Sequence, residues 1–268
     1  MYRTLLSITL LLLSSCSLQP AADASASLSD ATSSDLAATP SSSLASDTLS
    51  GWRPVADSLF TEGASVPADF VLLSDVCPDI MQEIRYYTTF NFVGRRIPGY
   101  TRPLAYLSRP AADSLRAVSE ELKQRGYRLK VFDAYRPQQA VAYFIRWARD
   151  VDDQVMKPYF YPDCPKSELF HRGYLAHKSG HSRGSTVDVT LFVDSLQRDA
   201  DMGSTYDLLG EASHFSYTTG LSPQQISNRR LLRDVMSRHG FRPIACEWWH
   251  FTLRNEPYPN TYFDFEIR

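Results

Sequence analysis

The chain has 268 residues, of which 43% are hydrophobic and 22% charged, and its formal net charge at pH 7 is -2. That length is sufficient for one well-buried domain with appendages. No basic block or long Lys/Arg stripe occurs, which argues against nucleic acid as a partner. The 15 Tyr, 14 Phe and 4 Trp suit an aromatic-lined core. We therefore expect a globular domain in which any disorder is local.

Residues 1–15 have the pattern of an export signal. Arg3 supplies a positive charge, and the apolar run from Leu5 to Leu13 is too short to span a bilayer comfortably. The tetrapeptide 13–16, Leu-Ser-Ser-Cys, resembles a bacterial lipobox, in which the cysteine is lipidated and becomes the new N-terminus. We expect lipidation at Cys16 and a cell-envelope location facing the periplasm or the cell exterior. An ordinary cleaved signal with an incidental cysteine is the alternative.

Residues 16–65 are expected to form a flexible tether that begins at the lipidated cysteine. From Gln19 to about Ser50 the chain is almost entirely Ala, Ser, Thr, Asp, Leu and Pro, with no Lys or Arg. Such a composition cannot bury enough apolar surface to offset its ordering entropy. A single catalytic domain is expected over residues 66–268.

Hydrophobic periodicity and turn residues predict alternating strands and helices from residue 66 onward. Strands are expected at 70–73, 84–89, 127–134, 187–193 and 241–253. Helices are expected from the Ser108 N-cap to Gly126, over 137–150, and from the Ser222-Pro223 cap to Gly240. There is no internal repeat, no βαβ series and no glycine-rich phosphate loop. The pattern predicts an α+β fold in which helices pack on a mainly antiparallel sheet.

The stretch Ser179 to Asp188 is the first candidate metal site. It reads Ser-Gly-His-Ser-Arg-Gly-Ser-Thr-Val-Asp, and its small residues let the backbone come close to a ligand. Asp188 opens a strand of core character, where a buried carboxylate needs a cationic partner. His181 and Asp188 can therefore share a metal ion, although spacing alone leaves a structural role equally open.

A second histidine lies in Glu247-Trp248-Trp249-His250. Residues three apart in a regular strand point to opposite faces, so Glu247 and His250 converge only if Glu247 lies at a strand end or in an irregular turn. If they converge, His250 is a third ligand and Glu247 can take a proton from water, as in zinc peptidases. The alternative is a salt bridge for Glu247 and an interior hydrogen bond for His250.

A third motif, Asp133-Ala134-Tyr135-Arg136-Pro137, lies where a predicted strand meets a predicted helix. An arginine held there by the following proline can place its guanidinium over the site and stabilise a developing oxyanion. A surface arginine at a turn is the alternative for this motif alone.

Together the three motifs have the order and spacing of a known family. They resemble the zinc D-alanyl-D-alanine dipeptidases, the VanX-like branch of the D-Ala-D-Ala peptidases. The resemblance covers the globular part of the chain and leaves out the lipobox and tether. It extends through Met202-Gly203-Ser204, Tyr206-Asp207, Asn228-Arg229-Arg230 and residues 256–265.

Carried over position by position, the resemblance implies one zinc ion per chain, held by His181, Asp188 and His250. Glu247 is expected to act as the general base and later as the proton donor. Arg136 is expected to stabilise the tetrahedral intermediate.

The resemblance also implies a pocket for a dipeptide. Asp207 matches the carboxylate that receives the ammonium group of the substrate, and Tyr86 and Ser179 match residues that line the pocket. A buried carboxylate in that place rejects longer peptides, because an amide cannot replace an ammonium group.

The function implied is zinc-dependent hydrolysis of D-alanyl-D-alanine in the bacterial cell envelope. One alternative is a D,D-carboxypeptidase of the same superfamily that trims peptidoglycan stem peptides and needs an open cleft at Asp207. Another is a non-catalytic, zinc-containing, cell-wall-binding lipoprotein. The expected partners are a small dipeptide and the membrane, through Cys16. Oligomeric state and disulfide pairing among Cys77, Cys164 and Cys246 stay open.

Overall fold

The computed structural model describes residues 65–268, so the predicted signal, Cys16 and nearly all of the predicted tether lie outside the described residues. The strands are β1 Phe70–Leu72, β2 Met81–Gln82, β3 Tyr106–Ser108, β4 Tyr127–Asp133, β5 Thr186–Val193, β6 Arg198–Asp199, β7 Phe241–Pro243 and β8 His250–Leu253. The helices are α1 Leu73–Val76, α2 Arg109–Lys123, α3 Gln138–Arg149, α4 Lys157–Phe160 and α5 Pro223–Arg238.

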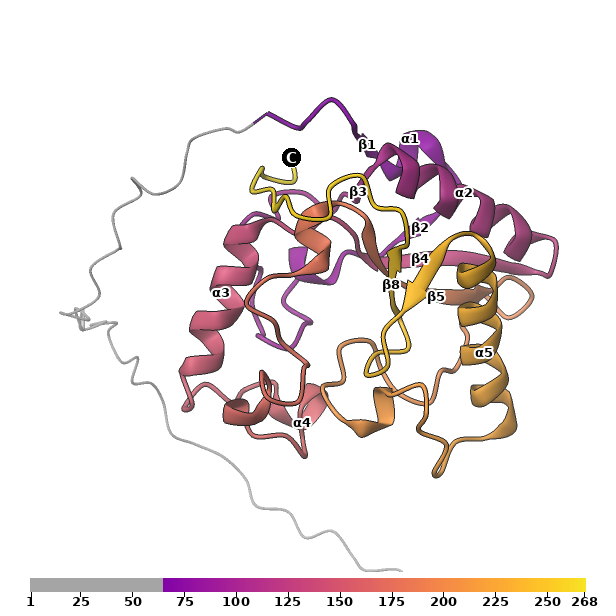
Figure 1. Ribbon diagram of the computed structural model, residues 1–268. Helices are drawn as coiled ribbons and strands as arrows, with labels where there is room; N and C mark the ends of the chain where they lie inside the picture. Colours follow the sequence, from indigo (N-terminus) through magenta and orange to yellow (C-terminus); the bar gives the residue numbers. More distant parts are fainter. Residues whose placement is uncertain (1–64) are drawn as a thin grey trace, which may run out of the picture. The chain divides into compact units, whose positions relative to one another are not determined.

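A six-stranded sheet with the order β2-β4-β5-β8-β7 forms the centre, and β6 pairs with β5 at one end (Figure 1). The short pairing of β2 with β4 is parallel, whereas the other pairings in this sheet are antiparallel. Strands β1 and β3 form a separate antiparallel pair. The predicted α+β class with a mainly antiparallel sheet is confirmed.

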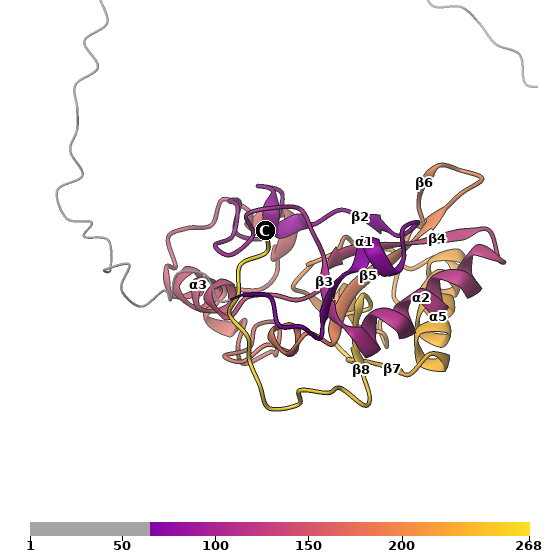
Figure 2. The same ribbon diagram turned by 90° about the horizontal axis from the view of Figure 1, so that it is seen from above.

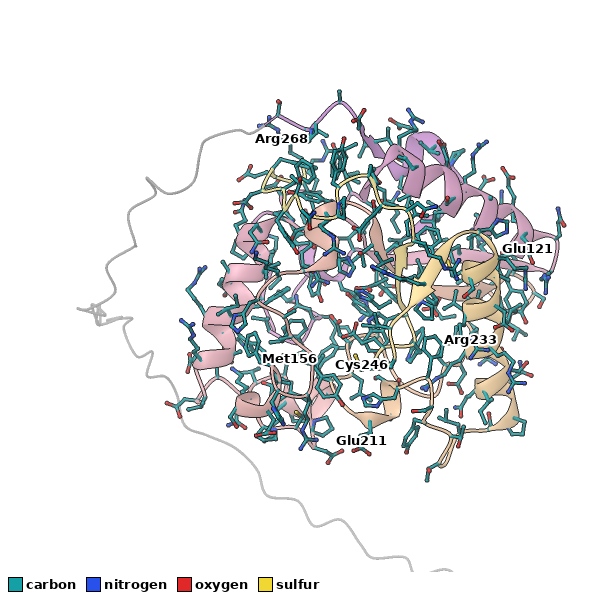
Figure 3. All side chains as sticks on the ribbon, in the orientation of Figure 1. Glu121, Met156, Glu211, Arg233, Cys246 and Arg268 are labelled. Carbon is teal, nitrogen blue, oxygen red and sulfur yellow. The ribbon has the colours of Figure 1, made fainter. Side chains whose placement is uncertain are left out.

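Helices α2 and α5 lie side by side and pack against the sheet, whereas α3 lies away from them, beyond the end of β4 (Figures 1 and 2). The buried positions of α2 recur three and four residues apart, which gives the helix one apolar face. At the far end of the pair, Glu121 accepts hydrogen bonds from Arg238 and His239 (Figure 3). These contacts fix the two helices to each other on the side of the sheet away from α3.

The two predicted serine caps behave differently. Ser222 forms a full capping box with Gln225, as expected for the start of α5. Ser108 occupies the N-cap position of α2 but makes no capping bond. Its hydroxyl instead pairs with that of Ser185 at 2.7 Å, which ties the start of α2 to the residue before β5.

Two predicted strands are wrong. The stretch 84–89 forms a 3-10 turn at Arg85–Tyr87, because its aromatic side chain at Tyr86 is buried in the domain while the backbone has no strand partner. The stretch 241–253 is not one strand but the antiparallel pair β7 and β8, joined by an irregular segment at 244–249. Local alternation predicts extended backbone in both places, but it does not show where the chain turns.

The C-terminal segment returns to the end of β4. The Phe265 ring stacks on the Tyr135 ring with centroids 3.9 Å apart. The Tyr135 hydroxyl accepts a hydrogen bond from the Phe265 backbone N–H at 2.8 Å. This contact fixes the turn after β4, which carries Arg136.

The described part of the chain contains neither a disulfide nor a membrane span. Cys77, Cys164 and Cys246 are free thiols there. Among residues 65–268, no helix combines the length and the apolar character needed to cross a bilayer.

Gly184 offers a test of how tightly the turn before β5 is packed. Its φ is 77°, and a Cβ at this position would lie 2.3 Å from the ring of Phe70. Gly184→Ala should therefore lower the free energy of unfolding by about 2–4 kcal/mol, through left-handed strain and overpacking together. Gly220→Ala is the matched control, since its φ is 73° but nothing lies within 4 Å of the added methyl. Denaturant unfolding measures both; equal losses would show that the contact with Phe70 does not matter.

Candidate active site

Three titratable residues form one row across the sheet. In the strand register Asp133 of β4 is the partner of Asp188 of β5, and Asp188 is the partner of His250 of β8. Direct partners on neighbouring antiparallel strands bring their side chains into contact when they share a face. A register irregularity between Val131 and Asp133 shifts the end of β4. The row therefore depends on pairing between segments far apart in the sequence.

His181 comes to this row from the 3-10 turn Gly180–Arg183, which leads into β5. Its backbone N–H donates to the Ser179 hydroxyl at 3.3 Å. Its Nδ1 donates to the backbone carbonyl of Ala134 at 2.7 Å. Since a carbonyl only accepts, Nδ1 carries the proton and Nε2 presents a lone pair to the site.

The geometry of the three predicted ligands fits a tetrahedral metal ion. His181 Nε2 lies 3.3 Å from His250 Nδ1 and 3.3 Å from Asp188 Oδ1, and the last two atoms are 3.1 Å apart. A tetrahedral ion with bonds of about 2.0 Å separates its ligand atoms by about 3.3 Å. Asp188 Oδ1 is buried and has no hydrogen-bond partner among the described residues. A cation at the centre of this triangle satisfies that oxygen.

The protonation states suit metal binding as well. Burial alone would raise the pKa of Asp188, but the imidazoles of His181 and His250 hold it below its ordinary range. Burial lowers the pKa of His250. The cluster therefore presents an ionised carboxylate and a neutral His250, which are the forms that bind a metal ion.

Glu247 lies in the irregular segment before β8 and follows Cys246, which is labelled in Figure 3. Its Oε2 is 3.4 Å from His250 Nδ1, and its side chain is only 12% exposed. Because Glu247 lies outside the regular strand, its side chain can point to the same side as that of His250, although the two residues are three apart. Burial, together with Asp188 and Asp207, raises the pKa of Glu247 well above its ordinary value. A carboxyl group with a raised pKa beside a metal cluster is suited to proton transfer.

The backbone that follows Glu247 is held by two consecutive tryptophans. Trp248 donates its backbone N–H to the Ser213 carbonyl at 3.0 Å and its indole N–H to the Ser204 hydroxyl at 2.9 Å. The carbonyl of Trp249 accepts a hydrogen bond from the N–H of Val189 at 3.0 Å. The irregular segment is therefore well ordered where it carries the carboxyl group.

Arg136 is fixed by charge on one side and aromatic rings on the other. Its Nε donates to Asp133 Oδ2 at 2.9 Å, and its Nη2 lies 3.6 Å from Asp188 Oδ2. The guanidinium carbon stands 5.0 Å from the ring centre of Tyr86 and 5.5 Å from that of Phe144. The guanidinium thus lies beside the candidate ligands with little freedom to rotate.

Asp207 stands apart from the ligand row. Its backbone adopts a left-handed φ of 61°, and its Oδ2 accepts a hydrogen bond from the Tyr86 hydroxyl at 2.9 Å. No cationic side chain of residues 65–268 forms an ion pair with it. Burial, reinforced by Asp188, raises the pKa of Asp207 to about 8. A buried carboxyl group of this kind is completed by a cationic ligand.

A cavity of about 180 Å³ joins these groups. Its walls combine polar groups with apolar side chains, which include Phe92, Val141 and Leu209. All the predicted site residues of the domain line it: Tyr86, Arg136, Ser179, His181, Asp188, Asp207, Glu247 and His250. The volume is below the roughly 300–1,000 Å³ of sites for drug-sized ligands, which favours a very small substrate.

The sequence prediction missed the groups that surround the site carboxylates. Asp133 is fully buried, lies 3.5 Å from His181 Nδ1, and accepts a hydrogen bond from Tyr100 at 2.7 Å. Tyr206 donates its hydroxyl to Asp188 Oδ2 at 3.1 Å. Asp133 and Tyr206 both belong to motifs that are visible in the sequence, but their contacts depend on strand register.

The fold and this site define a metallopeptidase: two histidines and an aspartate around one point, with a free carboxyl group and an arginine beside them. A family model described as D-ala-D-ala dipeptidase, in the M15 group of peptidases, matches residues 67–268. The chain belongs to this family.

Relatives of this chain include D-alanyl-D-alanine dipeptidases from three bacteria. The Enterococcus faecium protein is 37% identical over 199 residues, which is 74% of this chain and 98% of the relative. The Streptomyces coelicolor protein is 39% identical with the same coverage of 74% and 98%. The Escherichia coli K12 protein is 32% identical over 185 residues, with coverage of 69% and 84%.

The raised pKa of Asp207 gives a stability prediction. Between about pH 4 and pH 8 the folded chain keeps a proton on Asp207 that the unfolded chain releases, so this group's contribution to stability falls as pH rises. Asp207→Asn removes that dependence and should raise the free energy of unfolding of the metal-free protein by at least about 1 kcal/mol at pH 8.

Thermal unfolding of the two proteins at pH 5 and pH 8 checks this. The gain in stability from Asp207→Asn should be larger at pH 8 than at pH 5. A gain that is equal at both pH values, or a loss at pH 8, contradicts the buried and unpaired state of Asp207.

Proposed function

We propose that this chain is a zinc-dependent dipeptidase that hydrolyses D-alanyl-D-alanine to D-alanine. Membership of the family and the names of its relatives support the reaction. The environment of Asp207 supports a small substrate with a cationic group. Asp207 is buried and forms no ion pair among residues 65–268, and it lines the same cavity of about 180 Å³ as the candidate metal ligands.

Asp207 explains the preference for a dipeptide. The ammonium group of a short peptide pairs with the buried carboxylate, whereas an internal amide of a longer chain carries no charge and leaves it unpaired. The hydroxyl of Tyr86 orients the carboxylate by donating to Oδ2. A stem-peptide carboxypeptidase needs open space at this point, where the domain instead has a buried carboxyl group.

The donor set of His181, Asp188 and His250 fits zinc, which binds nitrogen and oxygen ligands in tetrahedral sites. When bound, zinc polarises the scissile carbonyl and makes a water molecule more acidic. Glu247 lies beside this cluster and takes the proton from the attacking water. Its raised pKa favours this uptake. Glu247 then passes the same proton to the nitrogen of the leaving D-alanine.

Arg136 stabilises the negative charge that develops on the carbonyl oxygen. Asp133 holds its Nε and its Nη2 lies near Asp188, so the guanidinium is fixed where the side chain lines the cavity. Donors that are already oriented need no reorganisation in the transition state, and removal of one such donor costs roughly 100- to 1,000-fold in kcat in other enzymes.

A hydrolysis assay tests the proposal directly. Purified protein should release D-alanine from D-Ala-D-Ala and lose this activity with a zinc chelator, and zinc should restore it. L-Ala-L-Ala controls for stereochemistry, and a pentapeptide ending in D-Ala-D-Ala controls for length. Activity on the pentapeptide with none on the dipeptide assigns the protein instead as a carboxypeptidase.

Two substitutions separate catalysis from metal binding. Glu247→Ala should keep one zinc per chain and lower kcat by about 100-fold or more, because it removes the proton acceptor. His181→Ala should lose both zinc and activity. Metal analysis and the hydrolysis assay on the same preparations check both results. A Glu247→Ala protein with unchanged turnover contradicts the enzymatic role.

We also propose, on the sequence of residues 1–16 alone, that the protein is a lipoprotein of the cell envelope anchored through Cys16. A Cys16→Ala protein should move from the membrane fraction to the soluble fraction, since it lacks the acylated cysteine. Fractionation with detection of the folded domain measures this. Continued membrane retention of the substituted protein contradicts the anchor.

A further inference from the structure

The proposed substrate carries two charges, and the site so far accounts for only one. A free dipeptide is a zwitterion with an ammonium group at one end and a carboxylate at the other. Burial of either charge without a partner costs free energy. Asp207 can receive the ammonium group, so the carboxylate needs a cationic partner in the same cavity.

Within the described part of the chain, the lining of the cavity offers two cationic side chains besides its histidines, Arg136 and Lys178. Arg136 is already paired: its Nε is bonded to Asp133, and its Nη2 lies near Asp188. Its place beside the ligand row suits the reacting carbonyl. The remaining cation, Lys178, is therefore the candidate partner for the terminal carboxylate.

Lys178 lies immediately before Ser179 and three residues before the candidate ligand His181. Its side chain is exposed to solvent at the cavity, and its Nζ stands 5.3 Å from the ring centre of Tyr262. No carboxylate of residues 65–268 forms an ion pair with it. A cation–π contact of this kind orients an ammonium group and leaves its charge available to an anionic ligand.

The segment that supplies Tyr262 is itself anchored near the candidate ligands. Arg183, in the turn that holds His181, forms hydrogen bonds from Nε and Nη2 to Glu256 at 2.6 and 3.0 Å. The guanidinium of Arg183 also faces the Tyr262 ring at 5.8 Å. The turn that carries His181 and the segment that carries Tyr262 are thus held together, and the ammonium group of Lys178 lies over the Tyr262 ring.

We propose that Lys178 binds the C-terminal carboxylate of the substrate and is a specificity-determining residue. This inference rests on the proposed dipeptidase function. Asp207 then binds the ammonium group of the dipeptide, and Lys178 binds its carboxylate. Peptides extended at either end lose one of the two charge pairs, so the site measures the length of its substrate by charge as well as by volume.

The test compares D-Ala-D-Ala with its C-terminal amide, which has the same scissile bond but no carboxylate. The wild-type zinc enzyme should prefer the free acid. Lys178→Met should lower kcat/KM for the free acid by about 3- to 5-fold, mainly through KM, because it removes the charge partner of the carboxylate at a solvent-exposed position. The amide should be affected by less than about 2-fold, so the preference largely disappears.

Two further variants serve as controls. Lys178→Arg keeps the charge and should retain most of the preference for the free acid. Lys157→Met removes a lysine that does not line the cavity and should behave as wild type. Binding of both dipeptides to the zinc-loaded Glu247→Ala protein, measured by calorimetry, gives the same comparison without turnover.

The outcomes separate this inference from the proposed function. If the wild type hydrolyses D-Ala-D-Ala but Lys178→Met lowers activity on acid and amide equally, Lys178 is only structural and the inference fails. An unchanged Lys178→Met protein overturns it as well. Absence of wild-type hydrolysis overturns the proposed function. Carboxylate recognition is still supported in that case if the Glu247→Ala protein binds the free acid but not the amide, and if the double variant with Lys178→Met loses this binding.

Discussion

Buried negative charge is the constraint on which the site depends. Asp133, Asp188 and Asp207 are all buried, and Glu247 is nearly so. Each ionised carboxylate in such surroundings loses hydration worth several kcal/mol, and neighbouring carboxylates repel each other. Arg136 and the imidazoles of His181 and His250 offset this cost around Asp133 and Asp188, and a metal ion bound there would offset it further. Asp207 forms no ion pair within residues 65–268, and burial together with Asp188 raises its pKa to about 8.

Phenol hydroxyls provide the second means of support. Each of the three aspartates accepts a hydrogen bond from a buried tyrosine: Asp133 from Tyr100, Asp188 from Tyr206 and Asp207 from Tyr86. Burial and the nearby carboxylates raise the pKa of these tyrosines well above 10.0, so they stay protonated and act as donors. Among the described residues, no tyrosine donates in this way to Glu247. The carboxyl group that we propose to exchange a proton, Glu247, is therefore the one without a fixed phenol donor among these residues.

The sequence predicted the chemistry better than the path of the chain. The ligand triad lies in short motifs whose residue types are chemically specific, and helices α2, α3 and α5 follow from their apolar spacing and their stops. The turn at Tyr86 and the break between β7 and β8 could not be predicted, because each is set by a distant partner: Asp207 for the tyrosine, and Ser213 and Val189 for the backbone around Glu247. The position of Asp133 beside His181 likewise depends on a register irregularity in β4 that no local pattern shows.

The contact between Phe265 and Tyr135 has a consequence for the order of assembly. The two residues are 130 positions apart, so the turn that carries Arg136 gains its clamp only when almost the whole chain has been synthesised. The same turn carries the Ala134 carbonyl, which accepts the hydrogen bond from His181 Nδ1 at 2.7 Å. Loss of the last few residues would therefore loosen both the backbone of Arg136 and the orientation of a candidate metal ligand, although the C-terminal segment contributes no side chain to the ligand cluster.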